Sequence, residues 1–227
     1  MSSPTLQVCR DCGGGAPVDV HFCPQCTKIL TLGRQGDYFA FVGLPRKLNI
    51  DVAALAQRYR SLSRQFHPDF FYNATPAERR ASLERSSYLN DACRTLKDPI
   101  ARIEYLLSLE GLAASNPHEA SRQVPPALLE EVFALNEELD EIRGLRARGS
   151  AGDAWQGRLE RARQPIEAKR VEHEAQLQEL AARWDAAVDI NATDRERRVV
   201  LDALRDRFLE RNYITNLLAG IERERRT

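Results

Sequence analysis

The chain has 227 residues, of which 43% are hydrophobic and 29% are charged, and its 33 basic residues balance its 33 acidic residues. This composition is ordinary for a globular protein with one large or two small domains. A nucleic-acid-binding protein would carry a basic excess, so we expect no nucleic-acid partner. No apolar run approaches the roughly 20 residues that a membrane helix needs, so we expect no membrane association.

The first residues, Met1-Ser2-Ser3-Pro4, lack the charged and apolar regions of a secretory signal. We therefore expect a cytoplasmic, reducing compartment, in which cysteines favour metal binding over disulfides. The alternative is the mitochondrial matrix, if the chain is a processed eukaryotic protein.

Residues 1–33 carry two cysteine pairs, Cys9/Cys12 and Cys23/Cys26, separated by a loop with three consecutive glycines. Each CxxC pair can wrap one side of a tetrahedral ion, and four thiolates fit a closed structural zinc site. Because the segment is too short to build a core, the metal would supply its folding energy. We predict one structural zinc per chain. Four thiolates also fit iron or a cluster, and a disulfide or a disordered tail is the alternative without metal.

A helical pattern follows and stops at His67-Pro68-Asp69, because a proline disfavours helix at the residue before it. The apolar face of this helix comprises Val52, Leu55, Tyr59, Leu62 and Phe66. Arg60 and Arg64 lie one turn apart on the opposite, solvent-facing side.

A second helix is predicted to open at Thr75-Pro76-Ala77-Glu78, which combines a capping box with a proline at the first helical position. It closes at Asp98-Pro99, and a further helix ends near Gly111. A helix with a basic face, an HPD loop and a returning helix together resemble a J-domain, the ATPase-stimulating module of the partners of DnaK-type chaperones.

The J-domain resemblance implies that His67, Pro68 and Asp69 contact the chaperone ATPase. Arg60 and Arg64 would steer the loop toward an acidic surface, with more effect on the encounter rate than on affinity. An isolated HPD tripeptide would be only a turn, but here it stands at a helix end behind a basic face. We expect no catalysis by His67, which has no nearby nucleophile or carboxylate pair.

After a linker at residues 111–125, three helical stretches are predicted, at about 126–146, 153–187 and 193–225. Their short connections favour an antiparallel three-helix bundle. A long coiled coil is the alternative, but the apolar residues are too irregular for sustained heptads. Pro165 is expected to kink or restart the middle helix.

The first bundle helix carries more apolar surface than its core needs. Its core stripe comprises Leu128, Val132, Leu135, Leu139 and Ile142. Leu129 and Phe133 lie off this stripe, on one ridge with Glu137 and Glu141 at four-residue steps. This ridge is either a protein-docking surface with an apolar anchor and an acidic rim, or part of a broad core face.

Isolated residues of chemical interest receive plainer predictions. Cys93 is assigned to the core, where free cysteine is often a small hydrophobe. His21 is expected at the surface because four cysteines already complete a metal's coordination sphere. His118 in the linker and His173 on a charged helix face are expected to be solvated.

Beyond the J-domain, several segments resemble the HscB-type co-chaperones of iron–sulfur cluster biogenesis. These are Asp37-Tyr38-Phe39, His67-Pro68-Asp69-Phe70-Phe71, Leu89-Asn90-Asp91-Ala92, Glu104-Tyr105-Leu106-Leu107 and Leu135-Asn136-Glu137-Glu138-Leu139-Asp140-Glu141-Ile142. The likeness covers nearly the whole chain from Asp37. The leading four-cysteine domain, especially Phe22-Cys23-Pro24-Gln25-Cys26, resembles the variant of mitochondrial and some bacterial members.

This resemblance implies an all-α, L-shaped molecule. A J-domain helical hairpin at residues 37–110 and a C-terminal three-helix bundle at residues 126–227 would follow the small zinc-binding domain. The bundle would hold the scaffold protein on which clusters are built. The scaffold-binding residues, carried over by position, are Leu129, Phe133, Glu137, Glu141 and Phe208, although Phe208 could equally be core.

The function implied is that of a non-enzymatic co-chaperone. It would bind the cluster scaffold, deliver it to a DnaK/HscA-class ATPase chaperone and stimulate ATP hydrolysis there. The chain departs from the family pattern at two positions: many members have a basic residue where this chain has Phe70, and some have an acidic residue where it has Ala134. The alternatives are a J-domain co-chaperone for unrelated clients and a cysteine-based metal or cluster carrier. A homodimer through the cysteine domain is left open.

Overall fold

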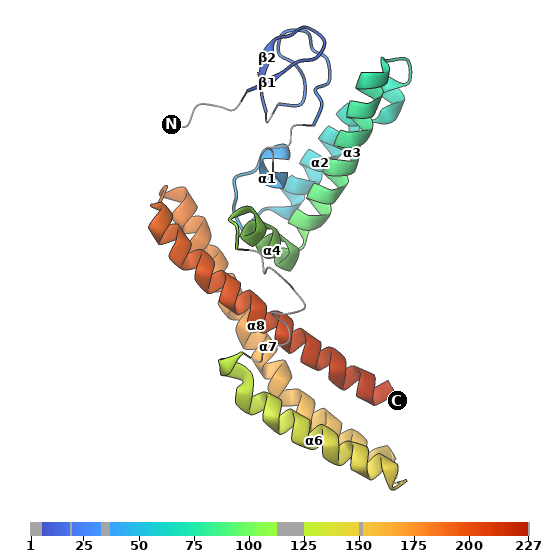
Figure 1. Cartoon of the computed structure of the whole chain (residues 1–227), viewed down its shortest axis with the longest axis vertical. Coiled ribbons are helices and arrows are strands. Elements are labelled where there is room, and N and C mark those ends of the chain that lie inside the picture. Colours follow the sequence, from blue (N-terminus) through green and yellow to red (C-terminus); the bar gives the residue numbers. More distant parts are fainter. Residues whose placement is uncertain (1–5, 19, 33–36, 113–124, 150–151, 227) are drawn as a thin grey trace. The chain divides into compact units, whose positions relative to one another are not determined.

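The computed structural model describes residues 6–18, 20–32, 37–112, 125–149 and 152–226, and it is shown in Figure 1. The chain divides into two compact units, Met1–Leu109 and Glu110–Thr227. Within the described ranges, helices dominate and the strands form one two-stranded sheet, so the predicted all-α class is confirmed. None of the helices described is long and apolar enough to cross a membrane. His118 lies outside the described residues.

The first unit begins with the cysteine-bearing segment. Strands β1 (Leu6–Val8) and β2 (Gly15–Pro17) pair antiparallel, with Gln7 opposite Ala16. An isolated antiparallel bridge then joins Phe22 to Ile29. Each of these two short ribbons encloses one CxxC pair, so the backbone brings both pairs to one end of the segment.

Helices form the rest of the first unit. They are α1 (Tyr38–Phe41), α2 (Val52–Phe66), the 3-10 turn η1 (Pro68–Phe71), α3 (Pro76–Lys97) and α4 (Pro99–Leu109). The Asp51 side chain caps α2, and α2 ends at the residue before His67, as the following proline requires. The capping box predicted for Thr75 and Glu78 is present at the start of α3.

The core of the first unit is rich in aromatic rings, including the fully buried Phe39 and Phe66. Val52 is 42% exposed, so the apolar face of α2 is one residue narrower than predicted. Cys93 is half-buried and packs against this core, where burial raises the pKa of its thiol to about 11. His21 was expected at the surface, but its ring packs edge-on against Phe41 and Phe66. Long-range packing of this kind leaves no local trace in the sequence.

The second unit consists of η2 (Pro126–Leu128), α6 (Leu129–Ala147), α7 (Gly152–Asp189) and α8 (Asp194–Arg226). The three helices pack as the predicted antiparallel bundle (Figure 1). Helix α7 runs through Pro165 without a break, so the predicted restart is wrong. Pro165 is exposed, and water can therefore satisfy the Arg161 carbonyl that loses its helical donor.

The predicted core stripe of α6 is buried, except that Leu139 is half-buried. It packs against aliphatic residues of α7 and α8, among them Leu159, Ile214 and Ile221. The prediction of a solvated His173 is wrong, because this side chain is 3% exposed and lies beside Glu210 of α8. A single histidine between charged neighbours in the sequence gives no sign that its helix turns it inward.

Candidate functional site

The first candidate site is the loop between α2 and α3. The backbone N–H of Asp69 donates to Nδ1 of His67 at 3.3 Å, and the Asp69 carboxylate lies 3.5 Å from the same nitrogen. Because Nδ1 accepts a hydrogen bond, the neutral ring carries its proton on Nε2. The Asp69 side chain is 87% exposed and Phe70 is 74% exposed. The loop therefore holds its three motif residues in a defined turn while leaving their side chains accessible to a partner.

The end of α2 fixes the position of this loop. Phe66 is fully buried, and its carbonyl accepts hydrogen bonds from the hydroxyls of Ser82 at 2.6 Å and Ser86 at 3.1 Å. A carbonyl at a helix end lacks its helical donor, and here α3 supplies two. Sequence reasoning missed both serines, whose spacing of four residues inside a helix was the available signal.

The arginines of α2 divide into two kinds. Arg58 donates to the carbonyls of Val42 at 3.0 Å and Gly43 at 2.7 Å, so it holds α1 against α2. Arg60 and Arg64 are exposed on the same helix, which ends at the HPD loop. Their positive charge is therefore presented to solvent next to the loop, as a surface for encounter requires.

The second candidate site is the four-cysteine cluster. The Sγ atoms of Cys9, Cys12, Cys23 and Cys26 all lie within 4.8 Å of one another. Cys9 and Cys26 are 3.6 Å apart and Cys12 and Cys23 are 3.7 Å apart, without a disulfide. Tetrahedral metal–sulfur bonds of about 2.3 Å place the sulfurs about 3.8 Å apart. The donor set therefore fits one metal ion.

Two matching turns build this cluster. In the first, Gly13 donates to the carbonyl of Cys9 at 2.9 Å, and in the second, Thr27 donates to that of Cys23 at 2.9 Å. Both residues have positive φ, 73° at Gly13 and 60° at Thr27. We call the segments Cys9–Gly13 and Cys23–Thr27 the first and second knuckles. The run of glycines after Cys12 marks the first turn in the sequence, whereas no glycine marks the equivalent conformation at Thr27.

The thiols of the cluster differ in acidity. Backbone N–H groups of Cys26 and Gln25 lower the pKa of Cys23 to about 7. The backbone at Lys28 lowers the pKa of Cys26, but burial and the neighbouring thiols raise it by more, to about 12. An ion would have to displace protons from these thiols, so its binding would weaken as pH falls.

The third candidate site is the ridge on α6. Leu129 and Phe133 are 41% and 67% exposed, so both lie outside the bundle core. Glu137 and Glu141 are also exposed. Glu141 forms an ion pair with Arg158 of α7, which also pairs with Glu138 at 2.9 Å. The negative charge at Glu141 is therefore partly compensated within the bundle.

Phe208 differs from the other residues carried over by resemblance. It is 7% exposed on α8, whereas the ridge residues lie on α6. Its side chain therefore offers little surface to a partner. The predicted alternative, that Phe208 is core, agrees with its burial.

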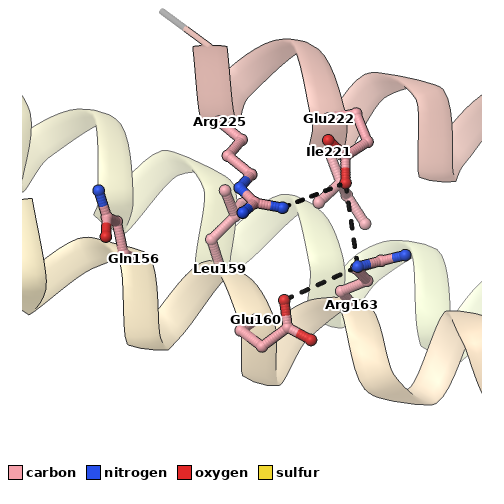
Figure 2. Close-up of a pocket in the computed structure, with 7 residues that line it drawn as sticks. All are labelled: Gln156, Leu159, Glu160, Arg163, Ile221, Glu222 and Arg225. Carbon is pink, nitrogen blue, oxygen red and sulfur yellow. Dashed lines mark ion pairs between the residues drawn. The ribbon is translucent and has the colours of Figure 1, made fainter.

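A depression between α7 and α8 is a further concave feature of the bundle (Figure 2). Glu222 pairs there with Arg163 at 3.9 Å and with Arg225 at 3.8 Å, and Arg163 also lies 3.9 Å from Glu160. The charges compensate one another, so the depression has no excess of one sign with which to attract a ligand. We assign it to helix packing.

No family model matches the chain. Two solved structures are similar to it over most of its length. One is the crystal structure of human co-chaperone protein HscB, which is 25% identical, covers 95% of this chain and 97% of its own, and gives a TM-score of 0.64. The other is chaperone HscB from Vibrio cholerae, at 29% identity, 82% and 96% coverage and a TM-score of 0.58. The HscB-type resemblance found in the sequence is thus confirmed, together with the four-cysteine cluster.

Proposed function

We propose that the chain is a co-chaperone of iron–sulfur cluster assembly that binds the cluster scaffold and delivers it to a DnaK/HscA-class ATPase chaperone. The observation that carries this proposal is the exposed His67-Pro68-Asp69 loop at the end of α2, in a chain similar to two HscB structures over most of its length. A J-domain that served unrelated clients would share the loop but would not explain a likeness that extends through the bundle.

The chemistry belongs to the partner in this proposal. The loop contacts the chaperone ATPase and stimulates ATP hydrolysis, with Asp69 as its most exposed charged group. Arg60 and Arg64 increase the rate of encounter with an acidic ATPase surface. No nucleophile is assigned to His67, whose ring instead shapes the turn by accepting the Asp69 N–H.

Replacing Asp69 by Asn tests this role. Because the side chain is 87% exposed, the variant should fold normally and keep its melting temperature. We expect it to lose stimulation of the chaperone's steady-state ATPase. The matched control is Asp91→Asn, which changes a half-exposed carboxylate of α3 that pairs locally with Arg94. Stimulation by Asp69→Asn at the level of the control would remove the J-domain assignment.

We further propose that the α6 ridge docks the scaffold, with Leu129 and Phe133 as apolar anchors and Glu137 as the acidic rim. The exposure of both anchors outside the bundle core supports this role. Glu141 is given a smaller part because Arg158 compensates its charge. Phe208 is given none in the folded bundle, since it is buried.

The double variant Leu129→Ala/Phe133→Ala tests the ridge. Anchor residues typically cost about 2 kcal/mol or more each when truncated, so scaffold affinity should fall strongly while bundle stability changes little. The matched control is Val171→Ala/Val199→Ala, which removes exposed apolar side chains from the other two helices. A large fall in bundle stability with unchanged scaffold affinity would show that the two anchors belong to a broad core face.

For the cysteine cluster we propose one structural zinc ion, because four thiolates make a closed site with no open coordination position. Such thiols stay reduced in the cytoplasm or the mitochondrial matrix, which we propose as the compartment. Elemental analysis of protein purified under reducing conditions should give one zinc per chain. A coloured protein that contains iron and sulfide would favour the cluster carrier instead.

A further inference from the structure

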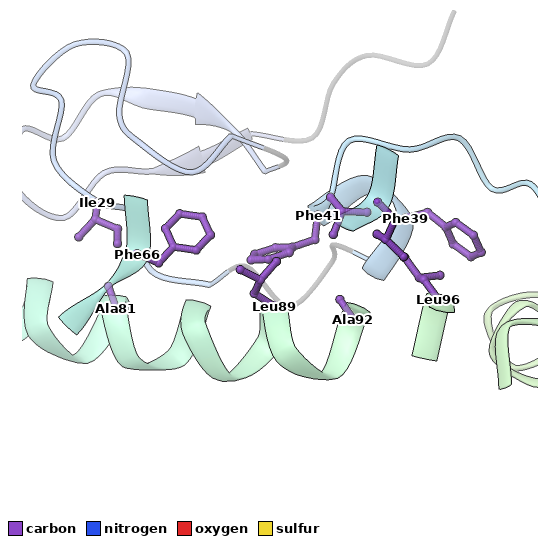
Figure 3. Close-up of a cluster of buried hydrophobic side chains, with 10 residues drawn as sticks. Ile29, Phe39, Phe41, Phe66, Ala81, Leu89, Ala92 and Leu96 are labelled. Atoms are coloured by element: carbon purple, nitrogen blue, oxygen red, sulfur yellow. The ribbon is translucent and has the colours of Figure 1, made fainter. Parts of the chain in front are cut away.

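The residues that flank the second knuckle are packed into the core of the first unit. Ile29, which follows Cys26 by three residues, is 5% exposed and belongs to the same buried cluster as Phe66. Figure 3 shows Ile29 and Phe66 together over Ala81 of α3. On the other side of the knuckle, the His21 ring lies 4.8 Å from the ring of Phe41 and 4.9 Å from that of Phe66, centroid to centroid. Residues on both sides of the knuckle therefore contact the end of α2.

A buried arginine contacts both the flanks of the second knuckle and the rings of Phe41 and Phe66. Arg85 of α3 is 2% exposed, and its guanidinium lies 5.9 Å and 5.8 Å from the ring centres of Phe41 and Phe66. It donates to the carbonyls of Leu30 at 2.7 Å and Thr31 at 3.3 Å and to Nδ1 of His21 at 2.8 Å. These three acceptors come from the residues that flank the second knuckle.

The three acceptors offset the cost of burying the charge of Arg85. Burial lowers its pKa to about 10, so the guanidinium is still charged at neutral pH. A buried charge is costly unless hydrogen bonds satisfy it. Arginine has donors only, so the His21 nitrogen that faces it must be the unprotonated one. The residues that flank the knuckle thus supply the groups that allow a charged side chain to lie among the rings around Phe66.

The flanks of the second knuckle pack into the core of the first unit, but its turn has little apolar core of its own to hold it in place without an ion. The buried cluster of the cysteine segment consists of Cys9, Ala16, Cys23 and Leu30, and two of these four are thiol ligands. Its strands are three residues long. So small a core cannot hold the turns in place, and metal binding would be coupled to the order of the segment.

We propose that the metal-held second knuckle is a positioning element for the HPD loop, and that Arg85 is the residue that couples them. With the ion bound, His21, Leu30 and Thr31 satisfy Arg85, and Arg85 and Ile29 hold Phe66. Phe66 directly precedes His67, so the geometry of the loop depends on this contact. Loss of the ion releases the three acceptors. The Arg85 guanidinium must then move away from the rings of Phe41 and Phe66 to be hydrated. The structural link does not depend on the co-chaperone role; only its consequence for ATPase stimulation does.

Hydrogen–deuterium exchange of the full chain tests the link directly. The wild-type protein is compared with metal bound, after removal by a chelator under reducing conditions, and after re-addition of zinc. Removing acceptors from a buried donor should speed exchange in residues 61–71 by roughly tenfold. Zinc should restore slow exchange, while residues 152–226 stay unchanged throughout. Unchanged exchange in residues 61–71 after verified loss of metal overturns the proposal.

An Arg85→Met variant separates Arg85 from the ion. It keeps all four cysteines, so it should still bind one zinc, yet exchange in residues 61–71 should be fast with and without metal. Zinc therefore protects the loop in the wild type but not in this variant, a pattern that a merely stabilising metal would not give. The matched control is Arg94→Met, an arginine of the same helix whose side chain is 81% exposed. Slow, wild-type exchange in zinc-bound Arg85→Met overturns the role of Arg85.

A second variant guards against misfolding of Arg85→Met. His21→Phe keeps an aromatic ring against Phe41 and Phe66 but removes one acceptor of Arg85. With metal bound, exchange in residues 61–71 should be faster than in the wild type but slower than in Arg85→Met. Exchange as slow as in the wild type would contradict the coupling. ATPase stimulation is measured last. If Asp69→Asn stimulates normally, the proposed function fails, while the exchange results still decide the structural link.

Discussion

The two units of the chain are held together in different ways. In the first unit, the decisive contacts join residues far apart in the sequence, such as Arg85 with Leu30 and Lys28 with Glu78, the latter at 2.8 Å. In the bundle, aliphatic stripes repeat along each helix, and many ion pairs lie within one helix, as do those of Arg170 with Glu167 and Glu174. Local pairs of this kind add little to stability.

This difference predicts how each unit responds when a side chain is truncated. The bundle spreads its stability over many similar apolar contacts, so it loses stability in proportion to the volume removed. The first unit adds to its aromatic core one buried charged side chain with three acceptors, and a cluster of four cysteines. The same number of deleted atoms should therefore have a local effect in the bundle and a more distant effect in the first unit.

The largest expected effect is on the bundle alone, from Leu204→Ala. Leu204 of α8 is fully buried, and truncating such a side chain typically costs about 2–5 kcal/mol. Both tryptophans of the chain, Trp155 and Trp184, lie in α7, so tryptophan fluorescence follows the unfolding of the bundle. Urea titration should show this loss, while zinc content and exchange in the first unit stay unchanged.

The control for this variant is Val199→Ala on the same helix, where the side chain is 60% exposed and the expected cost is within about 0.5 kcal/mol. Equal destabilisation by both variants would contradict a core at Leu204. Loss of zinc from Leu204→Ala would show that the two units do not unfold separately.

This contrast also explains how much the sequence could reveal. The bundle helices begin and end within three residues of their predicted bounds, because helical periodicity and breakers are local signals. The HPD turn and the cysteine cluster were equally accessible, since each is a short motif. Phe66 was found as an apolar position, but nothing near it in the sequence indicates His21, Ser82 or Arg85 as its neighbours.

The errors have the same origin. His21 and His173 were both expected at the surface, but His173 is buried and the half-buried His21 packs against Phe66, because burial of a polar side chain is decided by partners from other elements. Pro165 was expected to kink or restart a helix, and the restart is wrong, because α7 packs against its neighbours as one continuous helix. Local sequence propensity therefore predicts the positions of the helices well, but it predicts poorly which polar side chains become buried between them.

A smaller effect is expected at the second knuckle, from Thr27→Gly. Thr27 has a φ of 60°, a conformation that costs an L-residue about 1–2 kcal/mol and glycine much less. The variant should bind zinc more tightly in a chelator competition. The first knuckle supplies the reverse change, Gly13→Ala, where φ is 73° and a Cβ would meet nothing within 4 Å. That variant should bind more weakly by a similar factor. Equal affinity in both variants would mean that the turn residues do not limit metal binding.

The smallest expected effect is a pH dependence confined to the bundle. His173 of α7 is buried, and burial lowers its pKa. Its Nδ1 lies 3.3 Å from a Glu210 carboxylate oxygen, without the geometry of a hydrogen bond. The charges of Glu210 and, less strongly, Glu172 oppose the shift, whereas those of Arg207 of α8 and, least of all, Lys169 of α7 reinforce it. Burial prevails, so the folded bundle holds this proton less tightly than the unfolded chain does.

It follows that His173 stabilises the bundle fully above its unfolded pKa of about 6.5 and that this contribution is lost as pH falls below that value. In His173→Leu, which removes the titrating group and an unsatisfied buried nitrogen, the free energy of unfolding should fall less between pH 7.5 and pH 5.5. Urea titrations followed by tryptophan fluorescence at the two pH values measure this. His67→Leu, a change to the exposed histidine of the other unit, should keep the wild-type pH dependence. If the His173→Leu bundle is as pH-sensitive as the wild type, then His173 binds protons equally well in the folded and unfolded chain, and its burial beside Glu210 is electrostatically neutral.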